Sequence, residues 1–410
     1  MDFHEQCTKS YSNTGQFQMK PRVIRVGFVM AQTDIGWLGG IRYLSNLINA
    51  IYQLPNAKIQ PVLIVSHLIP DTLLEEFPSI ETIKTPLVDR ASIQGALRRI
   101  IKLSIGRDLL FERFLGVHHI KLLSHSGLLG RRSRIPTIVW IPDFQHLRMP
   151  QYFPERQIAA RNRSMRSTCK VASMIVVSSN DALRDLEGFD PAVREKSKVL
   201  QFVPRYYPPE NIAISILEKK YGFDGPYMFL PNQFWVHKNH QIVIDALAHL
   251  RTRGEQVLIL LTGHNIDTRH PGHFGQLMQS ANSKGVGGNF RHLGVVPPAE
   301  LAELMRNSVA VINPSFFEGW STSVEEAKAM GKTVLLSDIP VHREQNPKRA
   351  VYFDPHNSIA LADAISNTLL NYSLEDDKDF QALAEQEMNH RILAFGQKFE
   401  EIALALFEDS

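Results

Sequence analysis

The sequence is poor in cysteine and has no long apolar run. Its 410 residues include two cysteines, Cys7 and Cys169, far apart in the chain. Neither a disulfide framework nor a thiolate metal site is expected from them, and a reducing compartment fits. No window reaches the ~18 to 20 uninterrupted apolar residues of a membrane-spanning helix, and residues 1–20 lack the apolar core of a signal peptide. We therefore expect a cytoplasmic protein, neither secreted nor integral to a membrane, with residues 1–20 as a disordered leader.

A strong excess of one charge is also missing. The chain has 45 Lys and Arg against 42 Asp and Glu, a net charge of +3 that gives no reason to expect a nucleic-acid partner. The charge is nevertheless uneven, because residues 84–134 hold eleven Lys or Arg and three acids among apolar residues. Two interpretations stay open for this basic region: a solvated helix face, or peripheral contact with an anionic membrane at its inner face.

The composition is that of a globular protein, with 44% hydrophobic and 21% charged residues. A chain of this length exceeds one ordinary core, so two domains are expected. Short apolar runs alternate with helix-length amphipathic stretches in both halves, which predicts the α/β class with parallel sheets covered on both faces. The expected strands are residues 23–30, 61–65, 137–141, 174–178 and 199–203, then 228–230, 257–263, 290–294, 309–314, 333–337 and 350–353.

The proline-rich segment 203–212 separates the two series of strands. We predict an N-terminal domain over residues 21–205 and a second over 206–385. A final helix, within 386–410, is expected to pack back on the first domain. Two doubly wound units in tandem bring the carboxyl ends of their sheets to a shared cleft, where ligands bind.

The most specific motif lies in residues 313–338. A strand is followed by Pro-Ser and by Glu318-Gly319, and seven residues separate Glu318 from Glu326 ahead of Met330-Gly331. This arrangement strongly resembles the donor-site motif of group 1 (family 4) glycosyltransferases. These are retaining enzymes of the GT-B fold, in which two Rossmann-like domains face each other across a cleft. The resemblance covers the second half of the chain well and the first half only in outline.

The resemblance implies roles for individual residues. Lys238 would grip the donor diphosphate and stabilise the charge of the leaving nucleotide, Glu318 would contact the transferred sugar, and Glu326 would accept protons from ribose hydroxyls. These enzymes rely on the Lys and a helix dipole where others use a divalent ion, so no metal or cofactor is expected. The further donor-binding candidates are Gly39, Gly40, Asn232, His237, Gly319, Trp320, Ser321 and Thr322.

The residues themselves give partial support. Glu318 lies between a strand and a helix, so its carboxylate would face the cleft beside free backbone N–H groups. Lys238 precedes a predicted helix, where a cation opposes the macrodipole unless an anion is shared. Two alternatives remain: Lys238 as a solvated surface residue, and Ser323 to Glu326 as a capping box.

Asn232 departs from the family pattern, which commonly has Arg six residues before the Lys. Asn supplies no charge to a diphosphate. His237, Arg205 or another residue would have to compensate. This substitution keeps open a second hypothesis, a non-catalytic nucleotide-sugar-binding or assembly subunit.

The first half offers weaker candidates. Gly39 and Gly40 precede a helix, where backbone amides could approach a phosphate, although a simple turn explains them equally well. They form no G-x-G-x-x-G fingerprint, so nicotinamide binding gains no support. Asp143 and His146 follow a predicted strand and are acceptor-side candidates, with a structural role for His146 as the alternative.

Hydrolysis and metal catalysis have little support. The D-x-D of Asp377 and Asp379 lies in the run EDDKD, which is typical of a solvated charge cluster. A retaining glycosidase would need two carboxylates flanking one bond, whereas Glu326 is expected to face the ribose. The sequence therefore predicts a glycosyltransferase that moves sugar from a nucleoside-diphosphate sugar to a glycan or lipid-linked saccharide, in cell-surface polysaccharide synthesis.

Overall fold

A computed structural model describes residues 23–30, 38–89, 92–125, 129–205 and 212–408. The predicted leader, Cys7, most of the loop before Gly39 and the centre of the proline-rich connection lie outside these residues. The exact domain boundary therefore stays a prediction.

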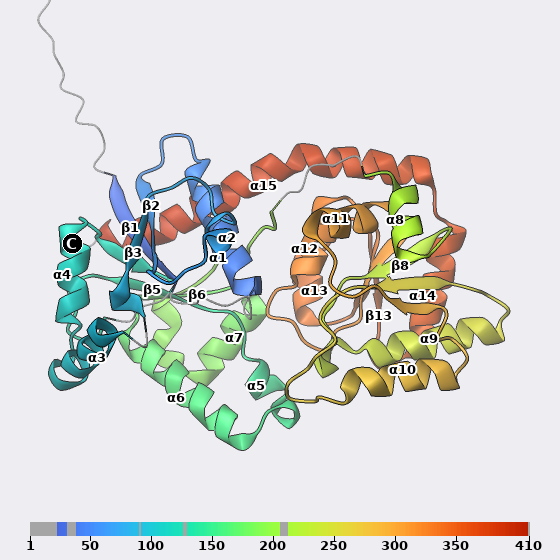
Figure 1. Cartoon of the computed structure of the whole chain (residues 1–410), viewed down its shortest axis with the longest axis horizontal. Helices are drawn as coiled ribbons and strands as arrows, with labels where there is room; N and C mark the ends of the chain where they lie inside the picture. Colours follow the sequence, from blue (N-terminus) through green and yellow to red (C-terminus); the bar gives the residue numbers. More distant parts are fainter. Residues whose placement is uncertain (1–22, 31–37, 90–91, 126–128, 206–211, 409–410) are drawn as a thin grey trace, which may run out of the picture.

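The N-terminal domain is built on a parallel sheet of seven strands in the order β3-β2-β1-β4-β5-β6-β7. Strands β1 and β6 are mostly apolar, and most of their residues are buried, because helices cover both faces of the sheet (Figure 1). The strands are β1 Ile24–Met30, β2 Ile59–Ser66, β3 Thr82–Thr85, β4 Leu122–Ser124, β5 Thr137–Ile141, β6 Met174–Val177 and β7 Ser197–Val199.

The second domain repeats this plan with a parallel sheet of six strands in the order β10-β9-β8-β11-β12-β13. The two sheets confirm the predicted α/β class. The strands are β8 Tyr227–Leu230, β9 Leu258–Leu261, β10 Phe290–His292, β11 Ala310–Asn313, β12 Val334–Ser337 and β13 Ala350–Phe353.

Helices connect the strands and cover both sheets, as the right-handed crossovers of parallel sheets require (Figure 1). In the N-terminal domain they are α1 Leu38–Tyr52, α2 Asp71–Leu74, α3 Ile93–Ile105, α4 Leu109–Val117, α5 Gln145–Arg148, α6 Glu155–Val171 and α7 Asn180–Phe189. In the second domain they are α8 Ile214–Tyr221, α9 His240–Thr252, α10 His273–Ser283, α11 Pro298–Asn307, α12 Thr322–Ala329, α13 Pro340–Gln345, α14 Ser358–Leu370 and α15 Leu374–Glu408. No described helix is at once long and apolar enough to cross a bilayer.

The last helix, α15, joins the two domains. It begins on the second domain, runs along the molecule and ends on the first (Figure 1). There Phe399 is fully buried with its ring centroid 5.6 Å from that of Phe28, and Gly396 faces Ala50 so closely that a Cβ would meet the Ala50 carbonyl. The helix starts well before residue 386, where the sequence places it, because the acidic run EDDKD is its first turn rather than a loop.

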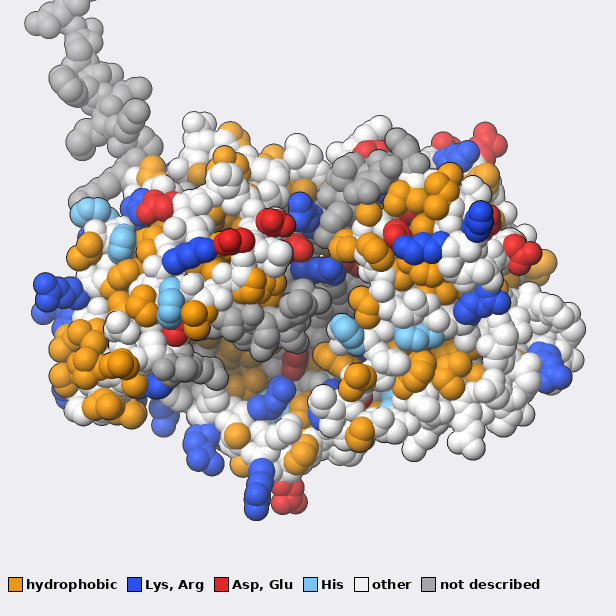
Figure 2. Space-filling model, viewed as in Figure 1, with side chains coloured by type: hydrophobic (Ala, Val, Ile, Leu, Met, Phe, Trp, Pro, Cys, Tyr) orange, Lys and Arg blue, Asp and Glu red, His pale blue; other side chains and the backbone are white. Residues whose placement is uncertain are grey.

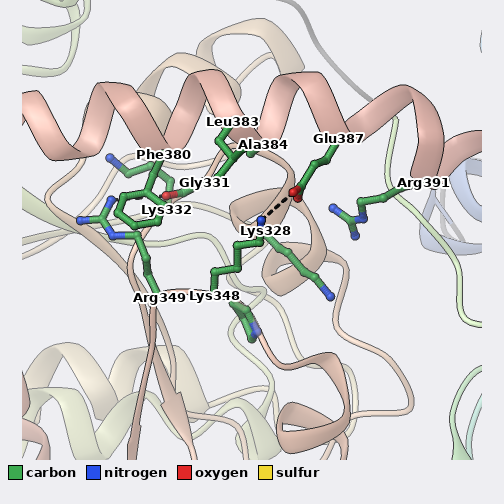
Figure 3. A pocket seen from close by; sticks show the side chains of 11 residues that line it. Lys328, Gly331, Lys332, Lys348, Arg349, Phe380, Leu383, Ala384, Glu387 and Arg391 are labelled. Carbon is green, nitrogen blue, oxygen red and sulfur yellow. Dashed lines mark hydrogen bonds and ion pairs between the residues drawn. The ribbon is translucent and has the colours of Figure 1, made fainter.

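The interpretation of Asp377 as a solvated acid is therefore wrong. Asp377 is 1% exposed, and its two carboxylate oxygens lie 2.5 Å from Lys332 Nζ and 2.7 Å from Arg349 Nη1. Figure 3 shows Lys332 and Arg349 gathered against α15. This buried charge cluster fixes the start of α15 to the second sheet. Asp379, by contrast, is exposed as expected.

Candidate donor site between the two domains

Two adjoining cavities of about 330 and 300 Å³ lie between the domains. Both are lined from the N-terminal domain by α1 and by Phe202, and from the second domain by the loops that follow β8 and β11. The larger cavity continues to α12, and the smaller one continues to the loop after β5. Residues common to both are Gly39, Tyr43, Phe202, Gln233, Trp235, Lys238, Glu318, Trp320 and Thr322.

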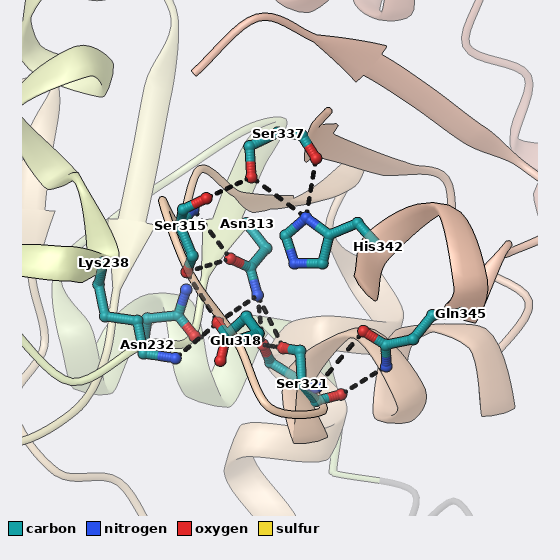
Figure 4. Close-up of polar contacts among 10 residues, drawn as sticks. Asn232, Lys238, Asn313, Ser315, Glu318, Ser321, Ser337, His342 and Gln345 are labelled. Atoms are coloured by element: carbon teal, nitrogen blue, oxygen red, sulfur yellow. Dashed lines mark hydrogen bonds and ion pairs between the residues drawn. The ribbon is translucent and has the colours of Figure 1, made fainter. Parts of the chain in front are cut away.

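Lys238 reaches this space from the loop after β8. It ends a single 3-10 turn, Val236–Lys238, and Asn239 then takes a left-handed conformation with φ 56°. The Asn239 amide donates to the carbonyls of Pro314 and Pro355, at 3.1 and 2.9 Å, and so ties this turn to the loop after β11. As a result Lys238 Nζ lies 2.6 Å from Glu318 Oε1 (Figure 4). The alternative of a solvated surface lysine is wrong, since the side chain is only 14% exposed.

Glu318 is a buried carboxylate held in place by donors. Besides Lys238, Ser315 Oγ lies 2.7 Å and Asn313 Nδ2 3.4 Å from Oε1. Burial alone would raise the pKa of Glu318, but the Lys238 ammonium outweighs it and holds the pKa at about 2. Glu318 is therefore an anion at every physiological pH, with one oxygen committed to these donors.

Asn313, at the end of β11, organises the loop and was not predicted. It is fully buried; its amide donates to Ser321 Oγ at 2.8 Å, and its carbonyl oxygen accepts from the Ser315 backbone N–H (Figure 4). Gln345 closes the other side, donating to the Ser321 carbonyl at 2.9 Å. Buried polar groups of this kind fix one conformation because each needs its partner. The signal in the sequence was an Asn where an apolar strand ends.

Glu326 lies in α12 and lines the larger cavity. The capping-box alternative is wrong, because α12 begins at Thr322 with Ser321 at its N-cap, and Ser323 Oγ donates instead to Asn232 Oδ1 at 3.2 Å. Burial raises the pKa of Glu326 to about 7, although the Arg42 guanidinium acts in the opposite direction. This carboxyl therefore titrates near neutral pH.

We expect Glu326→Gln to stabilise the unliganded protein more near pH 8 than near pH 5. Because the pKa of Glu326 is raised from 4.5 to about 7, protonation favours the folded state. That stability is fully present below pH ~4.5 and is lost as the pH rises through ~7, whereas Gln imitates the protonated form throughout. The free energy of unfolding of the variant relative to wild type should rise by about 1–3 kcal/mol between these pH values in urea titrations. An equal difference at both pH values would show that Glu326 is solvated.

Two buried donors of the larger cavity have no partner among the residues that the structure describes. Asn232, 5% exposed, uses its carbonyl oxygen for Ser323 and leaves Nδ2 unpaired, and Arg42 Nε is likewise buried and unpaired. Both residues line the cavity, from opposite domains. Buried donors without partners are rare and mark a place where a ligand group is needed. Arg42 was missed, since nothing in the sequence brings α1 opposite residue 232.

His237 and Arg205 do not supply to these cavities the positive charge that Asn232 lacks. His237 is buried and lines the smaller cavity, but burial lowers its pKa to about 3, so it is neutral. Arg205 is half exposed, lies 3.7 Å from Glu76, and is not among the residues that line either cavity. Arg42, from the opposite domain, is a cation that lines the same cavity as Asn232.

The residues after Glu318 form one of the contacts between the domains. A Cβ on Gly319 would come within 2.9 Å of the Asp143 side chain and closer still to the Pro142 carbonyl, so only glycine fits. Trp320 is 9% exposed and donates from Nε1 to the Phe202 carbonyl at 3.1 Å. Ser321 lines the larger cavity and Thr322 lines both.

Three of the four candidate residues from the N-terminal domain line at least one of the two cavities, and one does not. Gly39 lines both cavities and Gly40 the smaller one, and both lie in the first turn of α1. Asp143 lines the smaller cavity, where its Oδ1 accepts from the Gln145 backbone N–H at 2.9 Å. His146 is fully buried, bonds Asn162 at 2.9 Å through Nε2 and lines neither cavity, so the structural alternative holds for it. Among the described residues no group of three or more His, Cys, Asp and Glu is arranged to hold a metal ion.

The chain is similar to known proteins in sequence and in fold. Residues 214–387 match the model of the family "Glycosyl transferases group 1". Mannosylfructose-phosphate synthase of Agrobacterium fabrum is 21% identical over 150 residues, 35% of this chain and 33% of that protein, so the match spans about a third of that relative.

Solved structures resemble nearly the whole chain. A glycosyltransferase from Rickettsia africae is 17% identical with a TM-score of 0.66, covering 95% of this chain and 100% of its own. The Anabaena protein HepE in complex with UDP and glucose is also 17% identical, with a TM-score of 0.67 and coverage of 93% and 99%. Residues 214–387 thus form a group 1 glycosyltransferase domain, within a chain that has the GT-B fold.

Proposed function

We propose that this protein is a retaining glycosyltransferase that moves a sugar from a nucleoside-diphosphate sugar to a hydroxyl of a glycan or lipid-linked saccharide. The observation that carries the proposal is the buried pair of Lys238 and Glu318, 2.6 Å apart, facing a cavity that Glu326 also lines. One cation from the turn after β8 and two acids from the segment after β11 suit a ligand that is a diphosphate at its centre and carries hydroxyls at both ends.

Each residue would act on one part of the donor. A bound diphosphate would compete with Glu318 for the Lys238 ammonium, which then stabilises the charge that develops as the bond from the sugar to the phosphate oxygen breaks. Glu318 would accept hydrogen bonds from the sugar hydroxyls, and Glu326 from the ribose. The acceptor's hydroxyl oxygen would bond to the sugar carbon. At the same time the departing phosphate oxygen would take the proton of that hydroxyl. The reaction would need neither a metal ion nor a protein nucleophile.

The surroundings of the site support transfer rather than hydrolysis. The smaller cavity, next to Asp143 and to the stacked rings of Tyr43 and Trp140, would receive the acceptor. Gly319 and Trp320 close the domains on each other at this point, and such closure keeps water away from the reacting carbon. Asp143 therefore stays the acceptor-side candidate of this proposal.

The relatives favour a uridine-type donor and a role in saccharide synthesis. HepE was solved with UDP-glucose as well as with UDP and glucose. We place this protein in the cytoplasm, in cell-surface polysaccharide synthesis, with its basic region 84–134 against the inner face of an anionic membrane. A lipid-linked acceptor would be reached from that position.

A non-catalytic nucleotide-sugar-binding subunit is the second candidate, favoured by Asn232 at the position of the family's arginine. A thermal-shift screen with UDP, GDP, ADP and their glucose conjugates separates the possibilities. A transferase should be stabilised by one base and should turn over the matching donor with an acceptor panel; a binding subunit should be stabilised without turnover. No stabilisation by any of the six compounds would contradict both.

The same screen tests Arg42, which we propose replaces the missing arginine from the opposite domain. Arg42→Ala should lower the affinity for the preferred nucleoside diphosphate about 10-fold or more and leave the affinity for the bare nucleoside unchanged, because only the diphosphate needs the charge. Asn232→Arg added to Arg42→Ala should restore much of the loss. Equal losses for nucleotide and nucleoside would assign Arg42 to the ribose side instead, and Arg194→Ala, an exposed arginine, serves as the control.

A further inference from the structure

Helix α3 turns its apolar face to the solvent. Four large side chains spaced as one helical stripe are exposed: Ile93 by 85%, Leu97 by 49%, Ile100 by 61% and Leu103 by 86%. Ile105, the last residue of α3, and Leu109, the first residue of α4, are also exposed, at 44% and 40%, and Figure 2 shows hydrophobic side chains gathered over this part of the domain. A surface helix of a globular domain normally presents the opposite face to water.

The inner face of α3 is held to the domain by polar groups. The Arg98 guanidinium lies 2.6 Å from Asp108 and 3.8 Å above the ring of Phe111, and it donates to the Leu87 carbonyl at 2.9 Å. Gly95 sits directly against the Asp89 carbonyl. The helix is thus fixed in this orientation, and its outward apolar stripe is a property of the fold.

In the described part of the segment that carries this stripe, the exposed Lys, Arg, Asp and Glu side chains are all positive. Residues 92–134 contain two acids, Asp108 and Glu112, which are 1% and 8% exposed and paired with Arg98 and Arg107. No acid is exposed among the described residues of this segment, whereas five arginines are. These exposed arginines are Arg99, Arg113, Arg131, Arg132 and Arg134.

Two of these arginines flank the end of α3. Gly130 packs against the carbonyl of Gly106, the residue that caps the helix, and the Asp108 backbone N–H donates to the Leu129 carbonyl at 2.8 Å. Arg131 and Arg132 therefore lie next to the apolar stripe. Apolar side chains bordered by exposed cations match the boundary between the acyl chains and the headgroups of an anionic bilayer.

We propose that α3 lies in the plane of an anionic membrane surface, with Ile93, Leu97, Ile100 and Leu103 inserted among the lipids and the neighbouring arginines on the headgroups. A helix of 13 residues is about 20 Å long, so it lies in the interface and does not span it. A second copy of this chain is the less suitable occupant, since pairing two such faces brings cations against cations. This extends the membrane contact proposed for the basic region from surface attraction to insertion of one helix.

Sedimentation with vesicles tests this inference with the full chain and without any donor or acceptor. Wild type should pellet with vesicles of phosphatidylcholine and phosphatidylglycerol and far less with phosphatidylcholine alone. Leu103→Glu should weaken binding to the mixed vesicles about 10-fold or more, because it removes a leucine that would insert among the lipids and adds a negative charge next to anionic headgroups. Leu370→Glu is the matched control: Leu370 is 80% exposed on α14 of the second domain, and its replacement should change nothing.

Three results with vesicles would overturn the inference. They are the absence of wild-type binding, equal losses in the two glutamate variants, and equal binding to neutral and mixed vesicles. A wild-type dimer that Leu103→Glu dissociates in ultracentrifugation would assign the stripe to a second copy instead. Because both variants change exposed residues, thermal unfolding should be unaltered. Vesicle binding does not depend on sugar transfer. The proposal for α3 and the proposed transferase activity can therefore be refuted independently.

Discussion

Lys238→Ala is expected to lower the rate of sugar transfer at least ~100-fold, the range lost when one preorganised electrostatic contact to a transition state is removed. The Lys238 ammonium is 14% exposed and shares the cavity with Glu318 and Arg42. Its charge is therefore only partly screened by water where the departing diphosphate would lie. Glu318→Ala should cause a loss of similar size, because the sugar loses the carboxylate that orients it. Steady-state transfer with the donor found in the thermal-shift screen measures both.

If Lys238 and Glu318 formed a purely structural ion pair, the activities of the single and double variants would differ in another way. The variant that lacks both residues distinguishes the two cases. If Lys238 and Glu318 only stabilise each other, removing both should restore activity, since neither leaves an unpaired buried charge. We expect the double variant to stay as inactive as either single variant. Lys348→Ala breaks an exposed pair with Glu387 of the same 2.6 Å length and should leave transfer unchanged. Near-normal turnover of Lys238→Ala would reject its role.

Asp377→Ala is expected to have the largest effect on stability, about 3–5 kcal/mol, because it leaves Lys332 buried without its partner. Lys332 is 1% exposed, and burial lowers its pKa even beside Asp377. The same substitution frees Arg349, and with it the start of α15. Urea denaturation measures the loss. The matched control is Asp379→Ala, two residues away in the same acidic run and exposed, which should change the free energy of unfolding by less than about 0.5 kcal/mol.

The alternation of apolar runs was enough to predict the fold. Eleven of the thirteen strands in the described residues coincide with or overlap expected runs, because a strand of a parallel sheet is buried on both faces and so its sequence is mostly apolar. The strands not predicted are β3, whose sequence TIKT is half polar at the sheet edge, and β4, with three residues. Neither forms an uninterrupted apolar run, because TIKT contains polar residues and Lys121 interrupts the apolar residues next to β4.

The part of the candidate site that lies within one sequence motif could be predicted. Glu318, Gly319 and Glu326 follow β11 within a single motif, and Lys238 follows the neighbouring strand β8, so parallel strand ends bring them together. Arg42 and Asp377 were not predictable in this way. Their surroundings arise from packing between elements far apart in the chain, which local composition does not record.

The most direct test of the account is the crystal structure of the protein with the nucleoside-diphosphate sugar that stabilises it most. We predict the diphosphate in the larger cavity, with Lys238 Nζ within hydrogen-bond distance of a phosphate oxygen, the ribose at Glu326 and the sugar at Glu318. A donor bound elsewhere, or one lying in this cavity with Lys238 still paired to Glu318 and turned away from the phosphates, would contradict it.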